Sequence, residues 1–147
     1  MKISTKTRYG LRALVYIAEK TENSDELVRI KDISEKEKIS IQYLEQILYR
    51  LKKEGVVTGK RGPNGGYKIS RPSNEIRVSD IFEILESDPK IALCDKSVEK
   101  CENPDCTTIY LWNKLNKEIE KVLDNTTISE LMEVHKIKKN CKEQGRT

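Results

Sequence analysis

Three of the four cysteines in this 147-residue chain lie within thirteen positions, at Cys94, Cys101 and Cys106. The fourth, Cys141, is close to the C-terminal end of the sequence. The segment around the first three is polar, and its Asn-Pro-Asp sequence at 103–105 is typical of a bend that turns neighbouring sulfurs toward one centre. Thiolates are soft ligands for iron and zinc, and exposed thiols are redox-active. The spacing therefore indicates a metal or redox site.

Three kinds of cysteine chemistry fit this segment to different degrees. An iron–sulfur cluster usually takes four protein ligands, and these thiols would supply all but one of them. A zinc site favours two C-x-x-C-like pairs or a nearby histidine, and the segment contains neither. A disulfide or thiol switch stays open as the second interpretation, because the surrounding charges keep thiols exposed and reactive. Unrelated surface cysteines are the remaining alternative.

The composition limits the kind of protein that carries this segment. Charged residues make up 35% of the chain and hydrophobic residues 36%, which is enough for one domain, or one small domain with an arm. No apolar run approaches the roughly 18 residues of a membrane span, and the apolar stretch 11–18 is interrupted by Arg12 and lacks a signal-peptide cleavage site. We therefore expect a soluble cytoplasmic protein without a membrane partner. In that reducing compartment, clustered cysteines favour metal or redox roles over structural disulfides.

The charge is divided between the two halves of the chain. Residues 1–72 contain 16 Lys and Arg against 9 Asp and Glu, a balance of +7, whereas residues 73–147 contain 12 against 15, a balance of −3. A basic half followed by a mildly acidic half is typical of a polyanion-binding head with a regulatory or assembly tail. Ordinary scatter of charge is the alternative.

Apolar periodicity predicts a mainly helical chain. The clearest helix has Leu44, Ile47, Leu48 and Leu51 on one face, with Ser40 as its N-cap and Gly55 beyond its end. Other helices are expected from Ser4 or Thr5, near Lys31, from Ser79 and from Ile109, and a capping box at 127–130 predicts a last short helix before a frayed tail from Lys136.

A β-hairpin is expected directly after the clearest helix. Short β-branched runs at 56–58 and 67–69 flank the Gly-rich stretch 59–66. A phosphate-binding loop is a poorer interpretation, because Gly59-Lys60 is followed by Arg61 and no strand-to-helix switch follows. Short helix, tight turn, capped helix and hairpin together are the order of a winged helix-turn-helix, in which the second helix of the motif enters the DNA major groove.

The exposed face of the clearest helix and the hairpin tip supply the candidate DNA contacts. Glutamine pairs with adenine, glutamate accepts from cytosine, and serine and tyrosine suit phosphate oxygens. A basic tip with glycines that allow close backbone approach suits the minor groove. A merely solvated helix and a hairpin with incidental charge are the alternatives. The candidate DNA-binding residues are Ser40, Gln42, Tyr43, Glu45, Gln46, Arg50, Lys60, Arg61 and Gly62.

Four stretches of the sequence resemble the IscR/NsrR/CymR family of bacterial winged-helix regulators. They are MKISTKTRYGLRAL at the start, ISIQYLEQ at 39–46, RGPNGGY at 61–67, and the cysteines followed by Leu-Trp at 111–112. The likeness extends from residue 1 to about 133. It implies a homodimeric transcription factor that binds a double-stranded operator. It would read bases with Ser40, Tyr43, Glu45 and Gln46 and would insert Arg61 into the minor groove.

The resemblance also implies that the long helix from Ile109 forms the dimer interface. Independently, an amphipathic helix at the end of so small a domain needs a partner for its apolar stripe. A plain core helix is the alternative. The residues expected at the interface are Ile109, Trp112, Leu115, Ile119 and Val122.

The same resemblance implies an iron–sulfur cluster, with 2Fe–2S favoured over 4Fe–4S, held by Cys94, Cys101 and Cys106. IscR-like members carry a histidine as fourth ligand three residues after the last cysteine, and that position here is Ile109. NsrR-like members use an N-terminal aspartate, and the matching position here is Arg8. The fourth donor is therefore open among a partner-subunit group, a small molecule, and Glu102, Asp105, Thr107, His135 and Cys141.

The expected organisation has five parts: a DNA-binding domain at 1–72, a connecting helix at 73–93, a cluster-binding loop at 94–106, dimerisation and capping helices at 107–135, and a flexible tail at 136–147. The expected function is a repressor that senses cluster status, redox state or nitric oxide. A cluster-free repressor of sulfur or cysteine metabolism, switched by a thiol or a partner, is the alternative. An enzyme is not expected, because a single histidine offers little general-base capacity and no catalytic set accompanies it.

Overall fold

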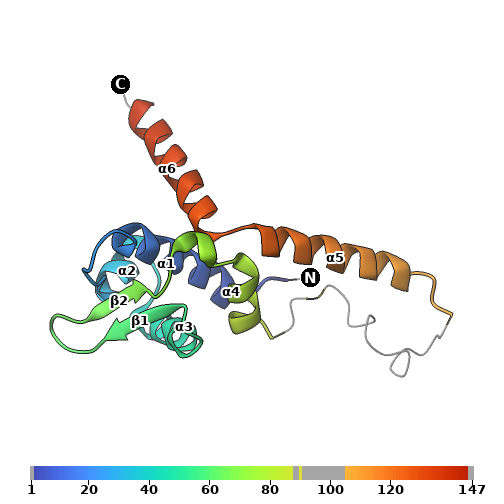
Figure 1. Cartoon of the computed structure of the whole chain (residues 1–147), viewed down its shortest axis with the longest axis horizontal. Helices are drawn as coiled ribbons and strands as arrows, with labels where there is room; N and C mark the ends of the chain where they lie inside the picture. Colours follow the sequence, from blue (N-terminus) through green and yellow to red (C-terminus); the bar gives the residue numbers. More distant parts are fainter. Residues whose placement is uncertain (1, 88–89, 91–104, 146–147) are drawn as a thin grey trace.

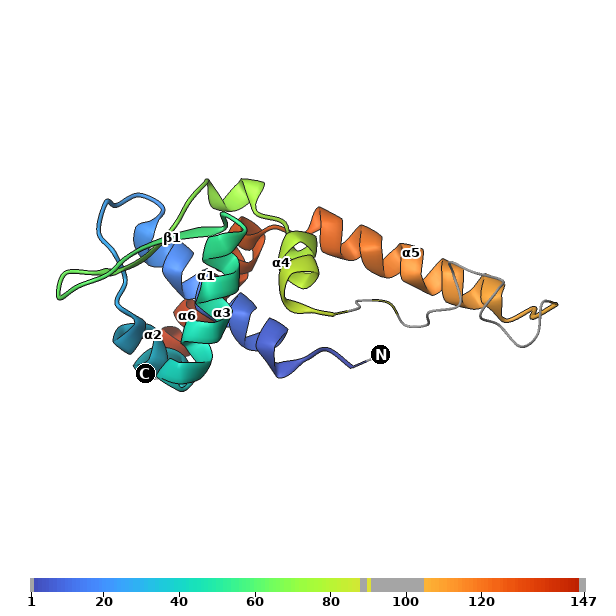
Figure 2. The same cartoon turned by 90° about the horizontal axis from the view of Figure 1, so that it is seen from below.

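The computed structural model describes residues 2–87, 90 and 105–145, and Cys94 and Cys101 lie outside this described part of the chain. Within it, a helical head carries one antiparallel hairpin, and a long helix projects from the head (Figures 1 and 2). The mainly helical winged helix-turn-helix architecture predicted from the sequence is confirmed. The elements are α1 (Thr5–Thr21), α2 (Ile30–Glu37), α3 (Ile41–Lys53), β1 (Val57–Lys60), β2 (Gly66–Ile69), a 3-10 turn η1 (Ser73–Glu75), α4 (Val78–Leu85), α5 (Ile109–Asn125) and α6 (Ile128–Gln144).

Local signals explain where the head helices begin and end. Ser4 caps α1 by accepting from the backbone N–H of Thr7 at 3.2 Å, and Ser40 caps α3 by accepting from Tyr43 at 3.2 Å. Between α2 and α3 the chain turns through Lys38, whose φ of 57° is left-handed. Gly55, with φ of 75°, lies just beyond the end of α3, where a residue without Cβ is favoured. The predicted caps of these helices are confirmed.

The core of the head forms where α1, α3 and α4 meet. Leu44, Ile47, Leu48 and Leu51 are fully buried along α3, as their spacing predicted. At Gly10 on α1, a Cβ would lie 2.4 Å from Cδ1 of the buried Leu85, so the absence of a side chain here leaves room for Leu85 of α4 in its present position. One face of α3 is thereby fixed against the core, and the other faces solvent.

The hairpin gains a third strand-like partner from the segment before α2. Strands β1 and β2 pair antiparallel with Val57 opposite Ile69, and the outer edge of β2 pairs with Val28. Val28 N–H donates to Tyr67 O at 2.9 Å, and Tyr67 N–H donates to Val28 O at 2.8 Å. At Gly66 a Cβ would lie 2.5 Å from Val28 O, so this pairing requires glycine there. Sequence patterning did not predict the pairing.

The C-terminal helices return the chain to the head. The junction between α5 and α6 is bonded to the start of α4, since Val78 N–H donates to Thr126 O and Ile128 N–H to Ile76 O, both at 2.9 Å. Thr127 then caps α6 by accepting from Glu130 N–H, as predicted. Ile128 and Met132 are buried where α6 packs against α1 and η1.

Helix α6 is longer than the sequence predicted. The predicted helix was short with fraying from Lys136, whereas α6 continues to Gln144. Residues 136–144 contain no glycine or proline and are rich in good helix formers, which explains the continuation.

No helix in the described part of the chain combines the length and the apolar character that a bilayer crossing requires.

The buried start of α6 provides a test of this packing. Ile128→Ala should lower the free energy of unfolding by about 2–5 kcal/mol, because it leaves a cavity at a fully buried site. Ile137→Ala on the same helix should change it by less than about 0.5 kcal/mol, since Ile137 is 62% exposed. Urea unfolding at one fixed protein concentration measures both variants. Equal losses for the two variants would contradict the packing described for α6.

Candidate nucleic-acid interface

The outer face of α3 presents most of the residues predicted to contact DNA. All of the predicted α3 set except Tyr43 is exposed: Ser40, Gln42, Glu45, Gln46 and Arg50. Ser40 uses its side-chain oxygen to cap the helix, which leaves its hydroxyl hydrogen for another acceptor. The row of amide, carboxylate and hydroxyl groups supplies the donors and acceptors that base edges require.

Tyr43 is half-buried rather than free on the surface. Its ring meets that of Tyr9 edge to face, with centroids 5.9 Å apart and planes at 81°. The Arg12 guanidinium lies 5.3 Å from the centre of the Tyr9 ring and donates to Glu37 through Nε at 3.0 Å. This chain of contacts connects α1, α2 and α3, so the direction of Tyr43 is set by packing and not by solvent.

The wing tip is thin, basic and exposed. Lys60, Arg61 and Gly62 all face solvent, and Gly62 has a φ of 112° that other residues rarely adopt. At Gly65 a Cβ would lie 2.1 Å from Lys60 O, so the returning strand passes very close to the outgoing one. A tip of this width, with two cations, suits a narrow groove.

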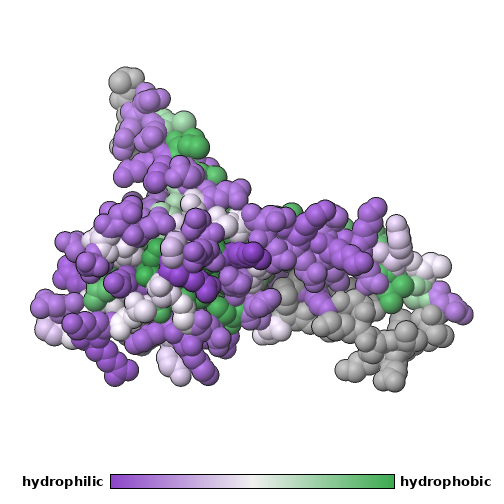
Figure 3. Space-filling view, in the orientation of Figure 1, coloured by the Kyte–Doolittle hydropathy of each residue, from purple (hydrophilic) through white to green (hydrophobic). Residues whose placement is uncertain are grey.

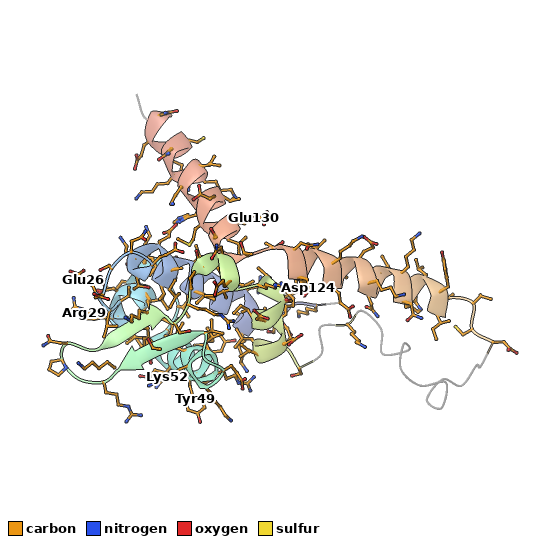
Figure 4. The ribbon with its side chains drawn as sticks, viewed as in Figure 1. Glu26, Arg29, Tyr49, Lys52, Asp124 and Glu130 are labelled. Atoms are coloured by element: carbon orange, nitrogen blue, oxygen red, sulfur yellow. The ribbon has the colours of Figure 1, made fainter. Side chains whose placement is uncertain are left out.

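A cleft of about 690 Å³ separates the wing from α3 and the start of α2. It is lined by one carboxylate, Glu45, and by five cations, Arg29, Lys31, Lys52, Lys60 and Arg61. Figure 4 marks Arg29 beside α2, and Tyr49 and Lys52 along α3. The residues predicted from the sequence did not include Arg29, Lys31, Tyr49 and Lys52. Lys52 lies seven residues after Glu45 on α3, and this helical spacing could have indicated that both are on the same exposed face. Arg29 and Lys31 reach the cleft through the pairing of Val28 with Tyr67, which the sequence did not predict.

Tyr67 lines this cleft from strand β2. Burial raises the pKa of its phenol above the ordinary value, and the negative charge of Glu45 raises it further, while Arg61 acts in the opposite direction. The hydroxyl therefore keeps its proton at neutral pH and can donate a hydrogen bond into the cleft.

The apolar residues of α5 divide between two faces. Ile119 and Leu123 line a pocket with Phe82 of α4, and Asn116 on this side is buried. Leu111, Leu115 and Val122, spaced by four and seven residues, lie on another face and are exposed. Of the residues predicted for the dimer interface, Leu115 and Val122 are therefore uncovered, Ile119 lies beside α4, and Ile109 and Trp112 are half-buried. Figure 3 shows apolar side chains at the outer end of α5 and along α6.

Of the three clustered cysteines, Cys106 is within the described residues. It is half-buried directly before α5, and its Sγ lies 3.0 Å from Thr108 Oγ1. Across the described ranges 2–87, 90 and 105–145, no group of three or more His, Cys, Asp or Glu side chains comes together as a metal site.

Two of the candidate fourth donors lie on α6, at the far end of α5 from Cys106. His135 Nδ1 contacts Glu19 of α1, and Cys141 is exposed beyond it. The 17 residues of α5 span about 25 Å, so neither donor is beside Cys106 of the same subunit. Asp105 and Thr107 are adjacent to Cys106 in the sequence, and Glu102 is outside the described residues.

Known proteins are similar to this chain in both sequence and fold. Residues 3–134 match the family described as "Rrf2: Iron-dependent Transcriptional regulator". The transcriptional regulators IscR of Pectobacterium atrosepticum and of Photobacterium profundum are 35% and 34% identical, each over 90% of this chain and over 79% and 76% of their own length.

Two solved structures have a similar fold. IscR of T. potens has 32% identity and a TM-score of 0.73, covering 92% of this chain and 88% of that chain. CymR, the global cysteine regulator of B. subtilis, has 32% identity and a TM-score of 0.72, covering 91% of this chain and 98% of that chain. The IscR relatives are named as transcriptional regulators, which is the class of protein that the sequence predicted for this chain. The chain belongs to the Rrf2 family of transcriptional regulators.

Proposed function

We propose that the chain is a repressor that binds an operator duplex with α3 in the major groove and the wing in the adjacent minor groove. The observation that supports this most is the shared cleft, in which Glu45 of α3 and Lys60 and Arg61 of the wing line one concave surface. The major groove is about 12 Å wide and admits a helix, and the minor groove attracts arginine where it is narrow.

The two elements divide the recognition. On α3, Gln42 and Gln46 can each make a bidentate contact to adenine, and Glu45 can accept from the amino group of cytosine. Ser40 and Tyr43 lie at the first turn of the helix, where a phosphate oxygen can approach both. Arg50, exposed nearer the end of α3, and Gly62, whose backbone allows close approach at the wing tip, complete the proposed contacts.

Removal of one wing cation tests the wing assignment. Arg61→Ala should weaken binding to a duplex that the wild-type protein has selected from a random-sequence pool. It should also lower the slope of log affinity against log salt by about 0.9, the contribution of one neutralised phosphate. Fluorescence anisotropy across a salt series measures both quantities. Lys121→Ala, an exposed cation on α5, is the control and should bind as the wild type does; unchanged binding by Arg61→Ala would refute the wing assignment.

We propose that two copies pair through the uncovered face of α5. Leu111, Leu115 and Val122 form an apolar stripe with no intramolecular cover within the described residues, and exposed stripes of this kind are buried by association. A two-fold dimer would present two α3 helices to two half-sites of the operator.

A charge placed in the stripe tests this dimer. Leu115→Glu should shift the molecular mass in sedimentation from dimer toward monomer, because a carboxylate would be buried without a partner. Operator affinity should fall with it, since each monomer reaches only one half-site. The control, Lys117→Gln, changes the charge by the same one unit on another exposed position of α5 and should leave the mass unchanged. A Leu115→Glu protein that stays dimeric would rule out this face of α5.

For the cysteine segment, we propose that Cys94, Cys101 and Cys106 hold an iron–sulfur cluster. The donor set fits, because three thiolates are suitable ligands for iron. When bound, such a cluster would supply sensitivity to oxidants, nitric oxide or iron–sulfur supply. The chain itself connects this segment to the DNA-binding head, because Cys106 lies three residues before the start of α5 and the junction at the other end of α5 is hydrogen-bonded to the start of α4. A change at Cys106 would therefore alter the start of the dimer helix and the spacing of the two α3 helices.

A cluster-free regulator is the second candidate, favoured by one observation. The oxidized form of Staphylococcus aureus CymR is similar to this chain, with a TM-score of 0.72 and 35% identity. Under this alternative the clustered thiols would act through oxidation alone, and the regulated genes would belong to cysteine metabolism.

Metal analysis separates the two candidates. After anaerobic reconstitution with iron and sulfide, the wild type should show visible charge-transfer absorption together with bound iron and acid-labile sulfide. Cys106→Ser should lose all three signals, because a soft thiolate ligand is removed. Cys141→Ser, which changes the exposed cysteine on α6, should retain them. Absence of bound iron and sulfide in the wild type would leave the thiol-switched repressor as the function.

A further inference from the structure

The proposed docking places one strand of the DNA in a defined position. The sugar–phosphate backbone of a duplex is the ridge that separates the major groove from the adjacent minor groove. If α3 occupies one groove and the wing the other, one strand has to pass between these two elements. The cleft of about 690 Å³ lies between them.

The walls of the cleft are held in place by backbone contacts. The two hydrogen bonds between Val28 and Tyr67 fix the segment before α2 to strand β2. Arg29 follows Val28 directly and Lys31 is three residues after it, so this pairing brings both cations to the cleft. Gly66 permits this pairing, because a side chain there would collide with the carbonyl oxygen of Val28. Lys52 is held on the opposite wall by α3.

The charges of these walls are available to an anion. Within the described residues, Lys31 and Lys52 form no ion pair. Arg29 shares its Nε with Asp32 at 3.3 Å, but its side chain remains 66% exposed. The Tyr67 hydroxyl is protonated and can donate, and the ring of Tyr49, which is 67% exposed, can cover a sugar. Cationic side chains and a phenol hydroxyl are the groups that typically contact phosphates.

We propose that this cleft is a phosphodiester site in which Arg29, Lys31 and Lys52 anchor the DNA strand that runs between α3 and the wing. The proposal rests on the proposed DNA-binding function. It adds three cations that are not among the DNA contacts proposed above on α3 and at the wing tip. Because phosphates are the same at every base pair, these residues set affinity and register without selecting a sequence. The base-facing residues of α3 select the sequence.

Substitution of the lysines tests the proposal. Lys31→Gln and Lys52→Gln should each weaken binding to the selected duplex and to its scrambled version by the same factor, about fivefold near physiological salt. This factor follows from a salt slope that falls by about 0.9 for each lost phosphate contact. The double variant should lose about twice that slope. Lys139→Gln, an exposed lysine on α6, is the control and should bind both duplexes as the wild type does. Because all three lysines are exposed, circular dichroism should be unchanged in every variant.

Two results would overturn the phosphodiester site while leaving the proposed function intact. One is unchanged affinity of both lysine variants for both duplexes. This result would overturn the site even if calorimetry showed that inorganic phosphate binds in the cleft. The other is a loss confined to the selected duplex, which would make these lysines base-reading. A wild-type protein that prefers no selected duplex over its scrambled version would instead refute sequence-specific DNA binding itself.

Discussion

The backbone pairing of Val28 with Tyr67 is the contact on which the geometry of the head depends. It joins the segment before α2 to strand β2 of the wing, while β1 follows α3 with only a short connection. The wing is therefore connected to α2 through this pairing and to α3 through the chain. Both hydrogen bonds are made by backbone groups, so they do not depend on the side chain at either position. What they require is the absence of a side chain at Gly66.

A second set of backbone contacts connects the head to the long helix. The start of α4 and the junction of α5 with α6 are bonded to one another, and α6 then buries Ile128 and Met132 against the head. Helix α5 thus cannot rotate without displacing α4 or α6, both of which pack against α1. Under the proposed function, a helix of about 25 Å that is fixed at one end in this way would transmit a change near Cys106 to the orientation of the head. This physical link does not depend on which chemistry the cysteines perform.

The sequence predicted those features of the fold that depend on local signals. The stripe of Leu44, Ile47, Leu48 and Leu51 defined both faces of α3, and the Ser40 cap defined its start. Contacts between distant segments were not predictable in this way. Val28 is one apolar residue in a polar loop, without periodicity, and its partner lies 39 positions away. For the same reason the sequence did not predict that Arg29 and Lys31 line the cleft, since they reach it only through that pairing. Nor did it predict the burial of Tyr43, which depends on Tyr9 of another helix.

The single carboxylate among the cations of the cleft explains how affinity and selectivity can coexist there. Under the proposed docking, the surrounding lysines and arginines would attract any duplex, which alone would give strong but unselective binding. Glu45 opposes this attraction, because a carboxylate brought close to DNA loses its hydration and is repelled by phosphates. That cost is offset where a base edge presents a donor, as the amino group of cytosine does, and it is not offset at thymine or guanine oxygens. The attraction of the cations for DNA therefore compensates for the repulsion by the Glu45 carboxylate, and this carboxylate makes the affinity depend on the DNA sequence.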